Sequence, residues 1–228
     1  MGKKYLGDMT IIYLTVNQHP EHFTNYQIDI LKKAAEGFPI ISVSRKPMDL
    51  GTNILDTGPK SHLNMYKQFV EAIRTVDTPY IAAAEDDVLY SREHFTEFRP
   101  PMDAVSYNRY RWSLFTWTNM FNIKDRISNC TLIAPKDYYI EAWEERFAKY
   151  PGDSLPPHRV SEIGRHNQEG WMGVSERNRV DWFSSVPIIH INHPAGTDST
   201  GFKKRMGSIR AIEIPYWGRA EDIVKEYR

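Results

Sequence analysis

Short apolar segments alternate with amphipathic ones along the first part of the chain. Residues 9–17 (MTIIYLTVN) and 38–44 (FPIISVS) are short and rich in β-branched side chains, which predicts two buried strands. Between them apolar side chains recur at helical spacing, at Phe23, Tyr26, Ile30, Leu31 and Ala34. Gly37 is a suitable C-cap for this helix. A strand, a helix and a strand in this order predict a right-handed β-α-β unit of a parallel sheet.

The same alternation repeats after an irregular stretch. Residues 45–60 contain Pro, Gly and Asp with little periodicity, which predicts a functional or flexible loop. A helix is predicted to begin at Ser61, its N-cap, and to end before Pro79. Its apolar face holds Leu63, Tyr66, Phe69, Val70 and Ile73. Residues 80–90 (YIAAAEDDVLY) then predict another buried strand.

The second half of the chain has a weaker pattern. Residues 111–123 alternate aromatic and polar side chains, which predicts one half-buried strand, and residues 128–147 predict a strand, a break at Pro135 and an amphipathic helix. Residues 149–173 predict loops, residues 186–191 a strand, and residues 220–227 a short helix. We therefore predict an α/β fold with a mixed, mainly parallel sheet flanked by helices, in one domain over residues 1–228.

Composition narrows the class of protein. With 228 residues, 41% of them hydrophobic, the chain can bury a substantial core, which excludes a disordered or fibrous protein. The 29 basic residues balance the 29 acidic ones, so no global field favours nucleic acid or a membrane as partner. The single cysteine, Cys130, excludes an intrachain disulfide and a cysteine-built zinc site, and we expect it in the core of a protein from a reducing compartment.

The N-terminal residues and the hydropathy favour a cytoplasmic location. No apolar run is long enough to span a bilayer, and no small-residue cleavage site follows the basic start MGKK. Leu6 stands where a myristoylation motif requires Ser or Thr. We therefore expect a cytoplasmic protein without a membrane partner.

Three consecutive carboxylates, Glu85, Asp86 and Asp87, end the apolar segment that starts at residue 80. One interpretation is that they cap a following short helix, because acidic residues suit a helix N-terminus. The other is a divalent cation beside a phosphorylated substrate, because Mg²⁺ and Mn²⁺ prefer carboxylates and share their remaining positions with phosphate oxygens. The carboxyl end of a parallel strand, where open α/β sheets bind ligands, favours the second interpretation.

The order of elements and this acidic triplet resemble the nucleotide-sugar glycosyltransferases of the GT-A fold. In that family a Rossmann-like first half binds the nucleotide, and a short acidic motif, usually written DxD, holds the metal that bridges the diphosphate. The resemblance implies a nucleotide-sugar-binding half over residues 1–100, an acceptor-binding half over residues 101–228, and Mn²⁺ or Mg²⁺ as cofactor. Asn64 stands where many members have an Asn near N-x-G, although the glycine is missing here.

Further positions follow from the resemblance. It implies that Asp87 is a direct metal ligand, that Glu85 and Asp86 contact the nucleotide or its ribose, and that the loop after the first strand contacts the base. That loop is Thr15, Val16 and Asn17. Asp49 would contact uracil or ribose, and the alternative is an aspartate that only stabilises a turn.

Two histidines follow the apolar strand at residues 186–191. Neutral imidazole is a good Mn²⁺ ligand beside carboxylate, and many GT-A enzymes complete their metal site with a C-terminal histidine. We predict His193 as that ligand rather than His190, because strand alternation can bury His190 in the core. The next loop carries Lys203, Lys204 and Arg205, which either neutralise the diphosphate or form a solvated face.

Glu169, in the stretch NQEGWMG, is the predicted catalytic base. The stretch looks like the region where inverting GT-A enzymes carry an acidic base beside Gly and Trp, and such a carboxylate deprotonates the acceptor hydroxyl. The alternative is a solvated loop glutamate, with Glu162 and Glu176 as competing candidates.

The sequence therefore predicts a metal-dependent glycosyltransferase that moves a sugar from a nucleoside-diphosphate sugar, with UDP as the expected nucleotide, to an acceptor hydroxyl. The acceptor is either a glycan or a hydroxymethylated base in DNA, flipped out of the duplex as by small bacteriophage glycosyltransferases. A nucleotidyltransferase ranks behind, because the first loop, TVNQHPEHF, is not glycine-rich. A non-catalytic nucleotide- or glycan-binding module is the third alternative.

Overall fold

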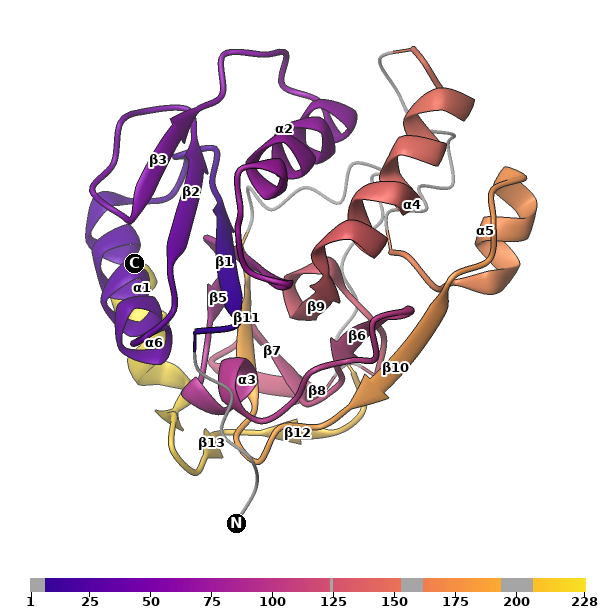
Figure 1. Ribbon diagram of the computed structural model, residues 1–228. Helices are drawn as coiled ribbons and strands as arrows, with labels where there is room; N and C mark the ends of the chain where they lie inside the picture. Colours follow the sequence, from indigo (N-terminus) through magenta and orange to yellow (C-terminus); the bar gives the residue numbers. More distant parts are fainter. Residues whose placement is uncertain (1–6, 124, 153–161, 194–206) are drawn as a thin grey trace.

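A seven-stranded mixed sheet forms the centre of the molecule (Figure 1). The computed structural model describes residues 7–123, 125–152, 162–193 and 207–228. The strand order is β10-β6-β9-β4-β1-β2-β3, in which β9 is antiparallel to both its neighbours and every other pair is parallel. The strands are β1 (Met9–Leu14), β2 (Ile40–Ser44), β3 (Thr52–Leu55), β4 (Tyr80–Glu85), β6 (Ala104–Asn108), β9 (Leu132–Pro135) and β10 (Asn178–Trp182). The predicted α/β class with a mixed, mainly parallel sheet is confirmed.

Helices cover both faces of this sheet because its central strands are apolar on both sides. On one face lie α2 (His62–Arg74) and α4 (Lys136–Lys149), joined by Tyr66 and Trp143, whose stacked rings have centroids 4.1 Å apart. On the other face α1 (Glu21–Ala34) and α3 (Arg92–Thr96) pack against β1 and β4. Successive residues of β1 alternate between the two cores, Ile12 on the α2 side and Tyr13 on the α1 side.

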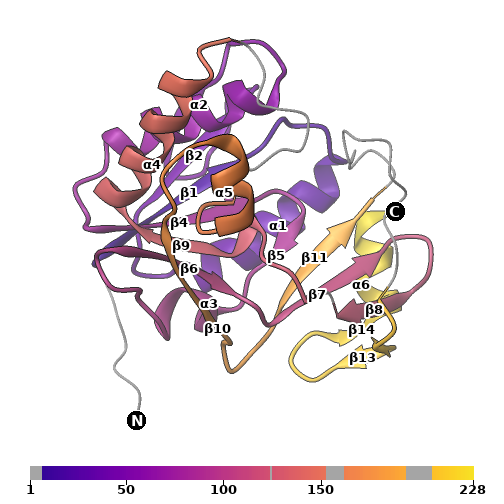
Figure 2. The same ribbon diagram turned by 90° about the vertical axis from the view of Figure 1, so that its right-hand side faces the viewer.

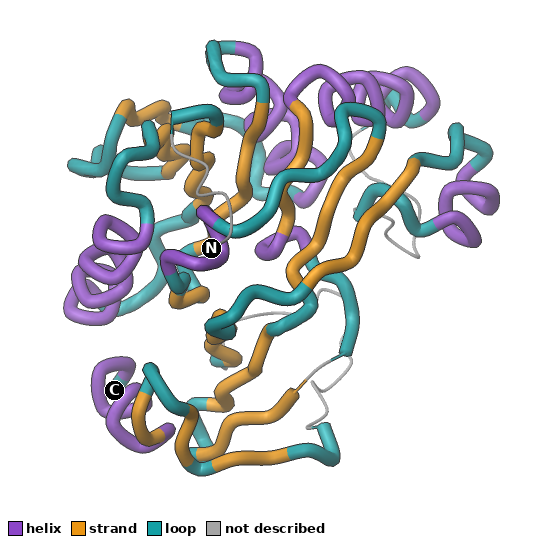
Figure 3. Tube along the Cα trace, turned by 60° about the horizontal axis from the view of Figure 1, so that its bottom comes forward, coloured by secondary structure: helices purple, strands orange, loops and turns teal. Residues whose placement is uncertain are grey.

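A second sheet of five strands lies beside the first, in the order β12-β8-β7-β11-β5 (Figures 2 and 3). Its strands are β5 (Val88–Leu89), β7 (Arg111–Phe115), β8 (Met120–Ile123), β11 (Ile188–Asn192) and β12 (Arg210–Ala211). One face packs under α6 (Ala220–Tyr227), which also contacts α1. The remaining elements are a short 3₁₀ turn (Asn129–Thr131), α5 (His166–Met172) and the ribbon of β13 (Glu213–Ile214) and β14 (Gly218–Arg219).

The helices predicted around residues 23–34, 61–74, 136–149 and 220–227 are confirmed, but the strand predicted over residues 80–90 is wrong. It is broken at Asp86 and Asp87 into β4 and β5, which belong to different sheets. The carboxylates end the first apolar piece, and the apolar residues that resume at Val88 belong to the second sheet. A turn of two carboxylates therefore joins the two sheets.

Three other predicted segments differ in detail. Residues 45–60 include β3, and residues 149–173 include α5. Residues 111–123 form two strands, since the chain reverses at Asn119, which adopts a left-handed conformation with φ of 49°. Strands β6 and β10 were not predicted. Among the helices of the described segments, none combines the length and apolarity that crossing a membrane requires.

Candidate functional site

A cleft of about 400 Å³ opens where β1, β2 and β4 reach their carboxyl ends. Parallel strands direct these ends to one edge of the sheet, which is where open α/β folds place ligands. The loops after β1, β2 and β4 and the first turns of α2 line the cleft. Its lining includes Thr15, Val16, Gln18, Arg45, Asp56, Lys60, His62, Met65, Glu85, Asp86, Asp87 and His193.

The acidic triplet forms one end of this cleft. Glu85 is the last residue of β4, and its neighbour in β1 is Leu14, so the loop after β1 lies directly beside the triplet. The hydroxyl of Thr15 donates to Oδ2 of Asp86 over 2.5 Å. The alternative that these carboxylates cap a short helix is wrong, because α3 begins at Arg92 with Ser91 as its N-cap.

The loop after β1 adds His19, which the sequence analysis did not consider. Its Nε2 lies 3.4 Å from Oδ1 of Asp86, and its ring meets the ring of His193 edge to face at 4.4 Å between centroids. Burial by itself lowers the pKa of His19, but the bond to Asp86 and the charges of Asp86 and Asp87 outweigh it and raise the pKa. Tyr227 of α6 contacts both imidazoles, at 6.0 and 5.8 Å between ring centroids.

His190 also belongs to the acidic end of the cleft. Its Nε2 lies 3.0 Å from Oδ2 of Asp87, and its Nδ1 lies 3.0 Å from Nη1 of Arg111. Antiparallel pairing of β11 with β5 brings His190 opposite Val88, the residue after Asp87. His193, the histidine favoured from the sequence, lines the cleft itself.

The donor set fits a hard divalent cation. Carboxylate oxygens and imidazole nitrogens are ligands for Mg²⁺ or Mn²⁺. Burial raises the pKa of Glu85 to about 8, and the charges of Asp87 and Asp86 add to the rise, so a cation bound here would offset the repulsion within the triplet. Within the described part of the chain no three His, Cys, Asp or Glu side chains converge as a ready-made metal cage. Such cations are commonly held by one or two carboxylates and completed by substrate phosphate and water.

Basic side chains form the other end of the cleft. Arg45 follows β2 and lies 3.1 Å from a carboxylate oxygen of Asp56, while its Nη1 donates to the carbonyl of Gly58. Asn64 donates to both oxygens of Asp56 at 3.0 Å, which holds the loop before α2. Lys60 lies in this loop and lines the cleft. The described hydrogen bonds of Asn64, which the resemblance placed near the nucleotide, therefore join α2 to the loop that precedes it.

Asn17 joins the loops that follow β1 and β2. It has a φ of 53°, which Asn tolerates better than most residues, and its Oδ1 accepts from the backbone N–H groups of Arg45 and Lys46 at 2.8 and 2.9 Å. Val16, beside it, is 41% exposed and lines the cleft. Asp49 is exposed and does not line the cleft. Lys203, Lys204 and Arg205 lie outside the described residues.

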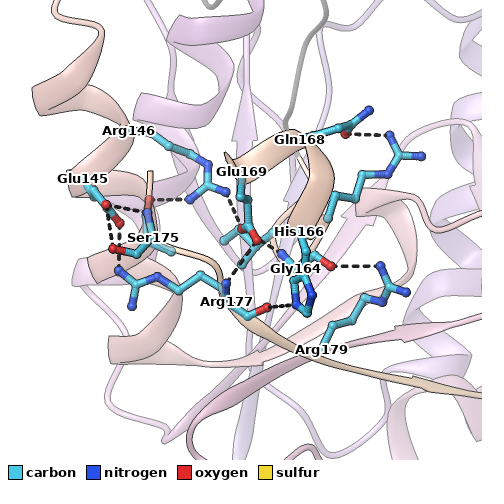
Figure 4. Close-up of polar contacts among 12 residues, drawn as sticks. Glu145, Arg146, Gly164, His166, Gln168, Glu169, Ser175, Arg177 and Arg179 are labelled. Carbon is cyan, nitrogen blue, oxygen red and sulfur yellow. Dashed lines mark hydrogen bonds and ion pairs between the residues drawn. The ribbon is translucent and has the colours of Figure 1, made fainter. Parts of the chain in front are cut away.

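Glu169, the predicted base, is completely buried and does not line the cleft. Figure 4 shows its polar contacts. One oxygen accepts from Nη2 of Arg146 at 2.7 Å and from the backbone N–H of Gly164 at 2.9 Å. The other accepts from the backbone N–H of Arg177 at 3.1 Å. Arg146 is equally buried, so the pair fixes α5 and the next loop to α4. The base role stays a prediction, and each described bond of Glu169 is structural.

The cleft or wall residues missed from the sequence include His19, Arg45, Lys60 and Tyr227. The first three follow strand ends or precede a helix on the same edge of the sheet, so the topological rule alone could have found them. Tyr227 is different, because the docking of α6 against α1 and β8 brings it to the site from the far end of the described chain.

No protein-family model matches the sequence, and neither does any curated protein. Among solved structures, the chain is similar to the mannosyltransferase PcManGT from Pyrobaculum calidifontis in complex with GDP-Man and Mn²⁺. The identity is 11%, the TM-score 0.45, and the match covers 82% of this chain and 57% of that one. It is also similar to a mutant Drosophila β1,4-galactosyltransferase 7 in complex with manganese, UDP-Gal and xylobiose. There the identity is 10%, the TM-score 0.46 and the coverage 86% and 76%.

A third similar structure belongs to another class of enzyme, the inositol-1-phosphate CTP transferase from T. maritima. The identity is 13%, the TM-score 0.46, and the match covers 86% of this chain and 94% of that one. The chain spans 57%, 50% and 45% of the first three similar structures, about half their length. These likenesses are partial and concern the fold.

Proposed function

We propose that the protein is a divalent-cation-dependent transferase that uses a nucleoside-diphosphate sugar as donor. The observation that carries the proposal is the order of charges along one cleft. Glu85, Asp86 and Asp87 stand with His193 at the β4 end, and Arg45 and Lys60 stand at the β2 end, where Asp56 pairs with Arg45. This arrangement suits an anionic diphosphate, whose oxygens would share a cation with the carboxylates at the β4 end of the cleft.

The spacing suits a nucleoside diphosphate. The two charged ends are separated by β1, which lies between β4 and β2, so they are two strand spacings or roughly 10 Å apart. Leu14, Val43 and Met65 supply apolar surface between them, which suits the flat base and the ribose of a nucleoside. The cleft volume of about 400 Å³ lies in the usual range for a small-molecule site.

The chain's own residues bind and orient the donor. Asp87 and Asp86 would hold the cation, with His193 as the nitrogen ligand, and the bound cation would stabilise the negative charge that develops on the leaving diphosphate. Thr15 holds one oxygen of Asp86 and thereby orients this carboxylate toward the loop after β1. Arg45 and Lys60 bring positive charge to the nucleotide end of the cleft.

The finer assignments are also part of the proposal. The donor sugar goes to an acceptor hydroxyl, either on a glycan or on a hydroxymethylated DNA base, and Lys203, Lys204 and Arg205 neutralise the diphosphate. UDP is the expected nucleotide and the cytoplasm the expected location. A nucleotidyltransferase would instead release pyrophosphate from a nucleoside triphosphate, so measuring pyrophosphate separates the two classes.

The test is calorimetric titration of UDP, GDP and CDP, each with and without Mn²⁺. We expect one of them to bind in the presence of Mn²⁺ and Asp87→Asn to weaken this binding at least ~10-fold, because a cation ligand is lost. Asp77→Asn is the matched control, since Asp77 is exposed and lies outside the cleft lining.

Two outcomes would contradict the proposal. Binding that is independent of Mn²⁺ and unchanged in Asp87→Asn would leave the acidic triplet without a cation role. Absence of binding for all three nucleoside diphosphates would remove the donor class. If binding is found, hydrolysis of the corresponding nucleotide sugars identifies the donor, and added glycans or hydroxymethylated DNA identify the acceptor.

A further inference from the structure

A buried arginine stands behind the acidic end of the cleft. Arg111 begins β7, and only 1% of its surface is exposed. Its Nη1 lies 3.0 Å from Nδ1 of His190, and its Nη2 is 3.4 Å from the carbonyl oxygen of Arg126. Burying a guanidinium is costly unless its hydrogen bonds and charge are compensated.

The geometry determines which ring nitrogen of His190 carries the hydrogen. A guanidinium N–H can only donate, so Nδ1 of His190 must accept and cannot carry a hydrogen of its own. Nε2 then carries the hydrogen and donates to Oδ2 of Asp87 over 3.0 Å. A doubly protonated ring would direct the Nδ1 hydrogen at the N–H of Arg111, which the 3.0 Å contact does not allow.

We propose that Arg111 and His190 form a positioning relay that fixes the carboxylate of Asp87 for cation binding, with His190 held in the Nε2–H tautomer. In this relay Arg111 donates to His190, and His190 donates to Asp87. His190 therefore acts through Asp87 as a positioning residue. This inference deepens the proposed function and rests on it for the role of Asp87, whereas the two bonds of the relay are independent of function.

The backbone supports the relay, because three strands place its members side by side. Parallel pairing sets Ser113, two residues after Arg111 in β7, opposite His190 in β11. The backbone N–H of Ile191 donates to the carbonyl of Asp87 at 2.7 Å, so the turn that carries Asp87 is attached to β11 through its main chain as well. Hydrogen bonds that orient a ligand typically change metal affinity 10–100-fold.

The first test is spectroscopic and needs neither substrate nor metal. Long-range ¹⁵N–¹H correlation spectra of the metal-free protein, labelled with ¹⁵N-histidine, report the tautomer of each ring. The signal of His190 is assigned through its loss in His190→Gln. We expect the pattern of a neutral ring with hydrogen on Nε2, and Arg111→Met should remove this preference. An Nδ1–H tautomer or a doubly protonated ring in the wild type would overturn the relay.

The second test is titration of Mn²⁺ in the presence of UDP. We expect His190→Leu to weaken Mn²⁺ binding about 10-fold. His190→Gln should recover most of this loss, because its amide N–H can replace the Nε2 donor. His94→Leu is the control for loss of a buried histidine, since His94 is completely buried in contact with Asn108 and does not line the cleft.

The two tests separate failure of the relay from failure of the proposed function. If the wild type and His190→Leu bind Mn²⁺ and UDP equally well, the relay is wrong and the proposed function stands. Wild-type protein that binds neither would overturn the function, and the tautomer of His190 would then decide the relay alone.

Discussion

The buried pair of Glu169 and Arg146 gives the sharpest stability prediction. Replacing Glu169 by Ala removes three hydrogen bonds, from Arg146 and from the backbone N–H groups of Gly164 and Arg177. It also leaves the guanidinium of Arg146 buried without its counter-charge, since both side chains have no exposed surface. Breaking a buried ion pair from one side typically costs about 3–5 kcal/mol of unfolding free energy.

The magnitude translates into a large shift in melting temperature. For a chain of 228 residues, each kcal/mol lowers Tm by about 2–4 °C, so we expect a loss of roughly 6–20 °C. Thermal and urea unfolding, followed by circular dichroism, measure this. Glu176→Ala is the matched control, because this exposed carboxylate should change the free energy of unfolding by less than ~0.5 kcal/mol.

A double substitution tests the physical cause. Glu169→Met combined with Arg146→Met removes both charges and fills similar volume, so it should be more stable than either single variant. A broken buried ion pair should lower the melting temperature clearly, so a Glu169→Ala protein that melts within ~2 °C of the wild type would refute the reasoning. If that variant also lost transferase activity, Glu169 would be the catalytic base that the sequence predicts.

Three further predictions follow from buried or capping side chains. Burial, with a smaller contribution from Arg99, lowers the pKa of His94 to about 3, so below pH 6.5 the unfolded chain binds a proton that the folded chain does not. Between pH 6.5 and 4.5 the wild type should therefore lose about 2 kcal/mol more than His94→Gln does, because the extra slope grows from about half of 1.4 kcal/mol per pH unit to nearly all of it. Urea midpoints measure this loss, and equal slopes for the two proteins would contradict the reasoning. Burial raises the pKa of Cys130 to about 12, so its thiol should not react with a disulfide reagent at pH 8 in the folded protein. Unfolding in urea should make the thiol reactive, and fast labelling of the native protein would contradict the burial of Cys130. Ser61→Ala should cost about 1 kcal/mol, because the Ser61 hydroxyl accepts from the N–H of Asn64 at the start of α2, while Ser61→Asp should retain the cap and the stability.

Much of the fold could be predicted because its central elements have clear patterns. α1 and α2 show helical spacing, β1 and β2 are short apolar runs rich in β-branched residues, and the carboxyl end of β4 placed Asp86 and Asp87 at the cleft. The break between β4 and β5 was missed because apolar residues resume at Val88, directly after Asp87, although the three carboxylates themselves interrupt the apolar run. Likewise, the short α5 is mostly exposed and polar, so its residues show no apolar face.

The pairing of side chains was harder to predict than their place. The sequence put His190 and His193 near the acidic triplet, and both lie there, but only the antiparallel pairing of β11 with β5 decides which one contacts Asp87. The sequence also cannot distinguish a loop carboxylate from a buried one. Glu169 looks accessible in its polar stretch, yet Arg146, 23 residues earlier in the chain, removes it from solvent.

Because Tyr227 contacts His19 and His193, the site is complete only after α6 has been synthesised and has docked. The loop after β1 and the acidic turn are synthesised early, whereas α6 leaves the ribosome after every other described element. The last strand of the central sheet, β10, ends at Trp182, so every strand of this sheet is synthesised before the helix that carries the aromatic wall. A nascent chain would therefore carry its acidic cluster, with the histidines unsupported, until translation reaches the last helix. The nascent chain should accordingly bind the cation later than it can form the sheet. Assembly of the scaffold and completion of the cleft are then separate steps.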